Sequence, residues 1–87
     1  MGSDETITIG QNRRENVGAS ENISIAENQT IQVGNTQKVY VGDLISITCG
    51  ASSLKMYADG TILLEGINVQ VKGSNHVDIL GEFVDIN

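Results

Sequence analysis

The chain has 87 residues, with no proline, 3% aromatic residues and 10 glycines, and this composition favours strands broken by turns over helices. A net charge of −6 argues against binding to nucleic acid and against attraction to anionic lipid, because both attract basic surfaces. The single cysteine excludes an internal disulfide. No apolar run is long enough to span a membrane and no signal-peptide pattern opens the chain, so we expect synthesis in the cytoplasm without export by a signal peptide.

An eight-residue repeat fills the first half of the chain, over residues 4–50. A small apolar residue followed by glycine, or once by alanine, recurs every eight residues from Ile9-Gly10 to Cys49-Gly50. A second apolar residue lies two positions earlier in each octad, except where Glu15 replaces it. A spacing of two places both residues on one face of a strand. Each octad therefore predicts a short strand and a corner, where glycine would allow a positive φ or a close backbone approach.

The register is lost after residue 50 and returns in a variant form over residues 51–87. Residues 54–66 alternate apolar and polar side chains around Asp59-Gly60, a dipeptide typical of tight turns. We interpret this segment as the same repeat continued with a shifted corner. The later inward pairs are Val69/Val71, Val77/Ile79 and Val84/Ile86.

The domain organisation follows from the absence of any linker, charge block or change in composition. The opening Met-Gly-Ser resembles an expression scar, so residues 1–3 stay outside the fold argument. We expect one domain over residues 4–87, made of the octads 4–50 and the variant region.

Octad length limits the architecture, because eight extended residues span at most about 26 Å, too little for a closed coil with side chains inside. Each octad must be one side of a larger ring. One chain can wind alone with three octads to a coil, which gives a stub of roughly 17 Å. Three intertwined chains, with one strand of each in every layer, give a rod of roughly 50 Å. Periodicity leaves both arrangements open.

Five segments, "ETITIG", "NRRENVG", "ENISI", "NQTIQVG" and "LISITCGASSLKMYADGTI", together resemble the C-terminal β-helix of VgrG proteins, the trimeric spikes of bacterial type VI secretion systems. Contractile phage tails carry a similar central spike. The resemblance implies an all-β, intertwined homotrimeric three-sided β-helix that punctures cells and is delivered to the extracellular space or a target cell. VgrG spikes follow two further N-terminal domains, so we expect a spike fragment.

The resemblance also implies partners and positions. A PAAR-repeat tip protein or effector would dock at the C-terminal end, on Phe83, Val84, Asp85, Ile86 and Asn87. The membrane would be crossed only under external force. The trimer core would be lined by the inward residues, namely Ile7, Ile9, Val17, Ile23, Ile25, Ile31, Val33, Val39, Val41, Ile47, Cys49, Val69, Val71, Val77, Ile79, Val84 and Ile86.

Glu15 interrupts the inward column, where three buried unpaired carboxylates would be costly. We expect Glu15 to reach water or to pair with Arg13 or Arg14 of a neighbouring chain. An axial ion or water site is the alternative.

Other reactive side chains carry no recognisable chemistry. His76 falls on the outward face, and Ser74 and Asp78 leave it without the His-x-His pair that holds iron in some phage spikes. Cys49 fits the core as a small apolar thiol. The carboxylates are scattered over outward and corner positions. We therefore expect no enzymatic activity, no metal and no cofactor.

Two other functions compete with the spike. A trimeric phage tail fibre or receptor-binding module would recognise a glycan, but the aromatic side chains that favour such sites are only Tyr40, Tyr57 and Phe83. A monomeric β-solenoid could bind a small ligand or ice, but threonines form no regular outer column.

Overall fold

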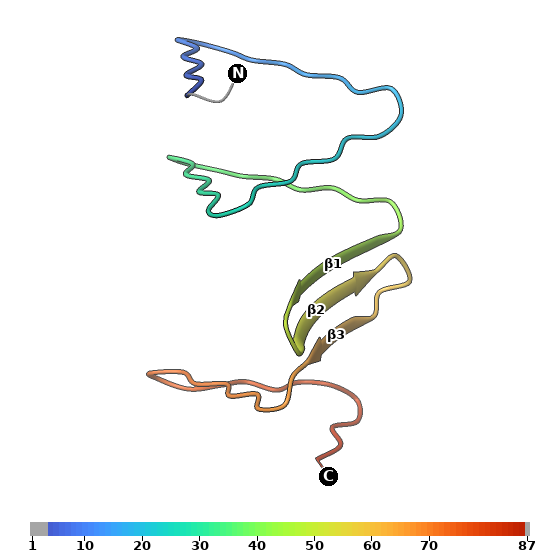
Figure 1. The fold of residues 1–87 in the computed structure, drawn as a ribbon. Helices are drawn as coiled ribbons and strands as arrows, with labels where there is room; N and C mark the ends of the chain where they lie inside the picture. The colour runs from blue at the N-terminus through green and yellow to red at the C-terminus, as the bar shows by residue number, and fades with distance from the viewer. Residues whose placement is uncertain (1–3, 87) are drawn as a thin grey trace. The chain divides into compact units, whose positions relative to one another are not determined.

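The computed structural model describes residues 4–86. The expected scar at residues 1–3 and the docking residue Asn87 lie outside the described residues. The described residues form three β-strands and no helix, which confirms the all-β class. Accordingly, no helix in this part of the chain could span a membrane. The chain divides after Asn35 into two units (Figure 1).

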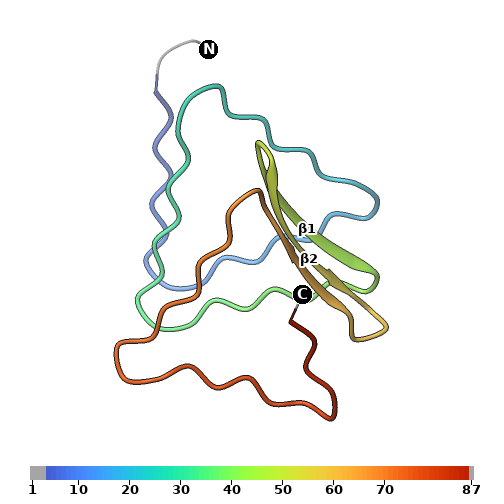
Figure 2. The same cartoon turned by 90° about the horizontal axis from the view of Figure 1, so that it is seen from below.

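The first unit is a series of straight runs joined by bends. Bends at 10–11, 18–19, 26–27 and 34–35 recur every eight residues and coincide with the glycine or alanine that ends each octad. In Figure 2 these runs outline a triangle, and the fourth run overlaps the outline of the first. In Figure 1 the fourth run lies below the first. The predicted corner at the end of each of these octads is confirmed, but the predicted short strands are not formed in the single chain, because the described residues before Leu44 have no strand to pair with.

The corner glycines of the octads do not have the conformation that the sequence suggests. Gly10, Gly18, Gly34 and Gly42 all lack a positive φ, and a Cβ added at any of them would meet no atom within 4 Å. The expectation of a positive φ or a close approach is therefore wrong for these positions within one chain. The reason is that no other segment of the chain lies close to these corners.

The second unit contains a three-stranded antiparallel sheet in the order β1-β2-β3. Strand β1 spans Leu44–Cys49, β2 spans Ser52–Tyr57 and β3 spans Ile62–Glu65. The reversal between β1 and β2 uses Gly50, whose φ is 56°.

The tight turn predicted at Asp59-Gly60 joins β2 to β3, and Gly60 has a φ of 98°. The Gly60 N–H donates to the Tyr57 carbonyl at 3.1 Å, and the Tyr57 N–H donates to the Thr61 carbonyl at 2.9 Å. The Thr61 N–H donates to Oδ1 of Asp59 at 3.0 Å. This prediction is confirmed.

The interpretation of residues 54–66 as the winding repeat with a shifted corner is wrong. The chain instead folds back twice on itself, and each strand pairs with the one before it. Two glycines at positive φ allow these reversals, and the alternating apolar residues of β2 and β3 give each strand a matching neighbour. The sixth octad therefore ends in a reversal at Gly50 rather than in a bend.

After the sheet, straight runs resume with bends at 67–68, 74–75 and 82. At Gly73 an added Cβ would collide with the carbonyl group of His76, so this corner requires glycine. At Gly81 an added Cβ would lie 3.2 Å from the Phe83 carbonyl oxygen, a tighter contact than most Cβ atoms make. The glycines at these two corners are thus more closely surrounded than those of the octads.

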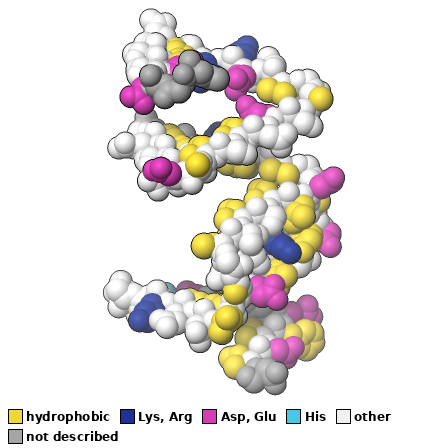
Figure 3. Space-filling model, in the orientation of Figure 1, with side chains coloured by type: hydrophobic (Ala, Val, Ile, Leu, Met, Phe, Trp, Pro, Cys, Tyr) yellow, Lys and Arg dark blue, Asp and Glu magenta, His cyan; other side chains and the backbone are white. Residues whose placement is uncertain are grey.

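No side chain of the described residues is buried. The chain exposes 9459 Å², whereas a compact folded monomer of 9.3 kDa exposes about 5,000 Å². The surplus is about 4,500 Å² for a single chain. Hydrophobic side chains accordingly lie open along the runs in Figure 3.

Candidate assembly surface and C-terminal end

The two inward positions of the octads form the first candidate surface. Relative exposure is 60% to 66% at the first position of each pair and 45% to 50% at the second. The two inward positions therefore differ in exposure in the same way from one octad to the next. We call these residues the octad column: Ile7, Ile9, Val17, Ile23, Ile25, Ile31, Val33, Val39, Val41 and Ile47.

The backbone of the octads is as open as their side chains. Within the described part of the chain, no residue before Asp43 makes a backbone–backbone hydrogen bond. A chain that wound alone would pair the first and fourth runs, which are one turn apart. That pairing is absent from the first unit, so N–H and C=O groups along the runs remain free to pair with other strands.

The sheet carries the second candidate surface. Cross-strand partners share a face, so the rows Ile45–Met56–Ile62 and Ile47–Leu54–Leu64 lie on one side. A shallow hollow on this side is lined in part by Ile47, Cys49, Leu54 and Leu64. We call this surface the apolar sheet face: Ile45, Ile47, Cys49, Leu54, Met56, Ile62 and Leu64.

The opposite face of the sheet is polar by comparison. It carries the rows Ser46–Lys55–Leu63 and Thr48–Ser53–Glu65, together with the pair Leu44–Tyr57. Lys55 and Glu65 place both charges of the three strands on this side. The sheet is therefore amphipathic, with one face suited to burial.

The sequence predicted only part of the apolar sheet face. The inward residues Ile47 and Cys49 both lie on this face, although Cys49 is exposed in the single chain. The residues that were not predicted are Ile45, Leu54, Met56, Ile62 and Leu64. Alternation on both sides of Asp59-Gly60 could have indicated the last four, but only the strand register places all five on one face.

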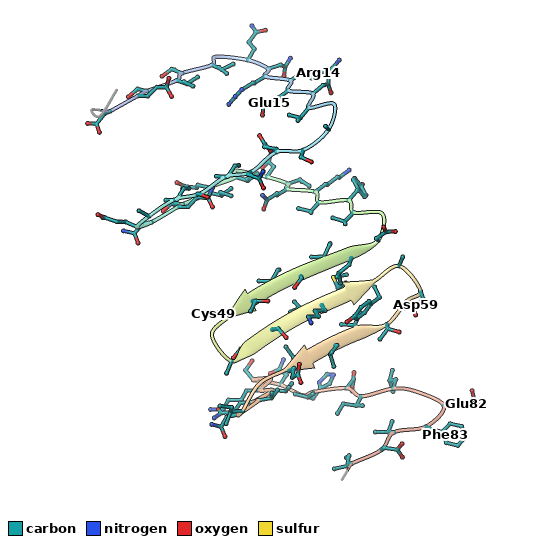
Figure 4. All side chains as sticks on the ribbon, turned by 45° about the vertical axis from the view of Figure 1, so that its right-hand side comes forward. Arg14, Glu15, Cys49, Asp59, Glu82 and Phe83 are labelled. Carbon is teal, nitrogen blue, oxygen red and sulfur yellow. The ribbon has the colours of Figure 1, made fainter. Side chains whose placement is uncertain are left out.

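Glu15 has an ionic partner in its own chain. The Nη2 atom of Arg13 lies 3.5 Å from Oε2 of Glu15, and both side chains are 56% exposed. Figure 4 shows Glu15 beside Arg14 on the second run of the first unit. The structure thus supplies one of the two expected arginines, but from the same chain rather than a neighbouring one.

The remaining reactive side chains of the described residues form one close pair, His76 with Asp78. Nε2 of His76 lies 3.2 Å from Oδ2 of Asp78, and both side chains are exposed. Cys49 lies at the end of β1, at the opposite end of the sheet from Asp59 (Figure 4). Across residues 4–86, no three His, Cys, Asp or Glu side chains are grouped as metal ligands would be.

The C-terminal end presents the third candidate surface. Of the five residues expected to dock a tip protein, Phe83 and Ile86 are almost fully exposed, while Val84 is 48% exposed. Asp85 is exposed as well. Figure 4 shows Phe83 next to Glu82, where the chain bends. The four described members of the docking set therefore lie in one open segment.

Comparisons with protein-family models, with curated proteins and with solved structures find no match for this chain. The chain is therefore characterised by its own geometry: an all-β protein of repeated unpaired runs, with one amphipathic sheet and uncovered aliphatic surfaces.

Proposed function

We propose that this chain is one of three identical chains of an intertwined, three-sided β-helix that serves as the cell-puncturing spike of a VgrG-like contractile injection machine. The supporting observation is the unpaired state of the octads. The described residues before Asp43 bend every eight residues, expose an aliphatic column and make no backbone hydrogen bond. Strands from two other copies would pair with the free backbone groups and would also cover the aliphatic column.

The geometry of three chains agrees with this proposal. Neighbouring strands lie about 4.8 Å apart, so a chain that leaves room for two others advances about 14 Å in each turn. In that arrangement every run pairs on both sides, and the octad column points to a shared axis. The surplus exposed area of the single chain would then become interface.

Mechanical puncture is the work that such a rod can do. Separating one layer would break backbone ladders in three chains together, so unfolding would be slow. Three chains of −6 each give the trimer a charge of −18, which provides no attraction to a phospholipid surface. The driving force for crossing a membrane must therefore come from the machine that carries the spike.

The exposed C-terminal segment supports a role in presenting a tip protein. Phe83, Val84 and Ile86 from three chains would meet at one end as an uncovered apolar surface beside open strand edges. A PAAR-repeat protein or effector would cover this end. The spike would be made in the bacterial cytoplasm and delivered to the extracellular space or a target cell.

Small-angle scattering of the protein in solution tests the proposal directly, because it gives mass and maximum dimension from one sample. The expected particle has a mass of about 28 kDa, three times 9.3 kDa, and a length of roughly 50 Å or more. A compact particle of 9.3 kDa would refute the trimer, and the spike function with it.

Docking at the tip requires a separate test. PAAR-repeat proteins should be captured by the full chain and lost when the last five residues are deleted, provided that the deleted form stays trimeric by scattering. Equal capture by the two forms would show that the C-terminal segment is not the docking site.

A further inference from the structure

The sheet is the only part of residues 4–86 that a single chain holds together through its backbone. All strand pairs and turn hydrogen bonds fall between Asp43 and Glu65. The most distant pairing joins Asp43 to Ala58, so the loops that must close are short. Local contacts of this kind form quickly. The sheet can therefore form before any partner chain arrives, whereas the octads cannot.

The apolar sheet face shares a residue with the octad column. Ile47 belongs to both, and its exposure of 60% is close to the 61% to 66% of its counterparts in earlier octads. Cys49 follows it in the inward position of the same octad. No charge lies on this face, whereas Lys55 and Glu65 lie on the other. We therefore expect one kind of partner, further copies of this chain, to cover both the octad column and the apolar sheet face.

The number of strands suits a three-sided assembly. In the proposed winding, each side of the prism holds three strands per turn, one from each chain. In the sheet, one chain supplies all three strands of a side. Three sheets from three copies would therefore close one full turn, with their apolar faces meeting on the axis and no break in the strand spacing of about 4.8 Å.

The octads fix the alignment of three chains only through Glu15, the one break in their pattern. At every other level, chains displaced by one octad would still bring isoleucine and valine together. Strand β1 belongs to the sixth octad, but the sequence of β2 and β3 is not repeated elsewhere in the chain. The rows of unlike side chains in the sheet therefore add a second constraint, because they match in only one alignment.

We propose that residues 44–65 nucleate the trimer and set its register. Three sheets associate first through the apolar sheet face, and the octads wind together from that point. This inference depends on the proposed homotrimer and adds the order in which its parts assemble.

The test compares refolding of the full chain with three alanine variants after dilution from denaturant. Leu54→Ala removes a side chain from the apolar sheet face, Val33→Ala removes one from the octad column, and Lys55→Ala is the matched control on the opposite face. A contact made in the nucleus controls the assembly rate, and a contact made later controls dissociation. Leu54→Ala should slow trimer formation by about tenfold or more, whereas Val33→Ala should mainly accelerate dissociation. Lys55→Ala should change neither rate appreciably.

The outcomes separate this inference from the proposed function. If Val33→Ala slows assembly and Leu54→Ala changes only dissociation, nucleation by the sheet is wrong while the trimer stands. If the unmodified chain is a monomer at every concentration, the homotrimer itself is wrong.

Hydrogen exchange provides a second measurement in case Leu54→Ala fails to assemble. The unmodified chain, diluted until it is monomeric, should show protected amides only within residues 44–65. Protection in the octads, or no protection in the sheet, would overturn the proposal.

Discussion

At the scale of single residues, the Arg13–Glu15 pair is the only ion pair among the described residues of the octads. The two residues are two positions apart, so both lie on the side of Val17. In the single chain the pair is half exposed, and such a pair contributes about 0–1 kcal/mol. If three copies enclose it near an axis, removing one partner would cost about 3–5 kcal/mol. The loss of stability on removing one partner therefore indicates whether the pair lies in water or is enclosed.

Arg13→Ala should accordingly destabilise the trimer strongly, because it leaves Glu15 enclosed without a partner. The double substitution Arg13→Gln with Glu15→Val restores the octad pattern and should be neutral or stabilising by about 1–4 kcal/mol. Chemical denaturation measures both, with Arg14→Gln as the control on the other side of the run. If Arg13→Ala costs less than about 1 kcal/mol, the pair lies in water and the interior at this level is open.

Val33 lies in the middle of the octad column and tests its inward direction. Val33→Asp would place three carboxylates near the axis without partners, and we expect it to abolish the trimer. Gln32→Asp adds the same charge on the opposite face and should leave the trimer intact. Sedimentation velocity and heat resistance measure the result. A Val33→Asp trimer of unchanged mass and stability would mean that the column does not face the axis.

At the scale of elements, the sequence predicted the corners and turns that neighbouring residues determine, and it missed the structure that depends on pairing with another strand. The corners were predictable because the chain repeats them every eight residues, and the turn at Asp59-Gly60 because its residues adopt that geometry by themselves. The reversal at Gly50 was not predictable, because the same octad pattern gives two different results. It gives a bend at Val41-Gly42 and a reversal at Cys49-Gly50. The difference lies in β2, whose apolar residues provide a partner for β1.

The role assigned to glycine was wrong at the octad corners for a related reason. A bend of about the same shape forms at Ala26, where a side chain is present. A candidate surface could be predicted where the eight-residue repeat alone defines its residues, as in the octad column. The five missed residues of the apolar sheet face could be assigned to it only from the strand register, which the sequence pattern does not determine.

Gly60 and Gly34 test the distinction between a turn that requires glycine and a corner that does not. Gly60→Ala places a side chain at a φ of 98°, so it should destabilise the sheet by about 1 kcal/mol or more in each chain. Gly34→Ala has no such strain, since no atom lies within 4 Å and Ala26 occupies an equivalent corner. Thermal denaturation by circular dichroism should show a lower transition for the first variant only. An equal loss in Gly34→Ala would reveal that another chain approaches that corner closely.

At the scale of the whole molecule, a chain that exposes 9459 Å² and buries no described side chain has no core of its own. If assembly supplies the core, stability is inseparable from concentration. The denaturant midpoint, measured after samples reach equilibrium, should therefore rise with protein concentration. A midpoint that stays constant over a hundredfold dilution series would indicate a fold stabilised within one chain.

The antiparallel order of the sheet has one more consequence, which concerns direction. Each of its two turns reverses the chain, so β3 leaves the sheet running in the same direction as β1 entered it. The runs after the sheet can then circle the axis in the same sense as the octads before it. A sheet with two or four strands would send the chain back the way it came and force the later runs to circle in the opposite sense. An insertion that preserves this direction must therefore add strands to the sheet in pairs.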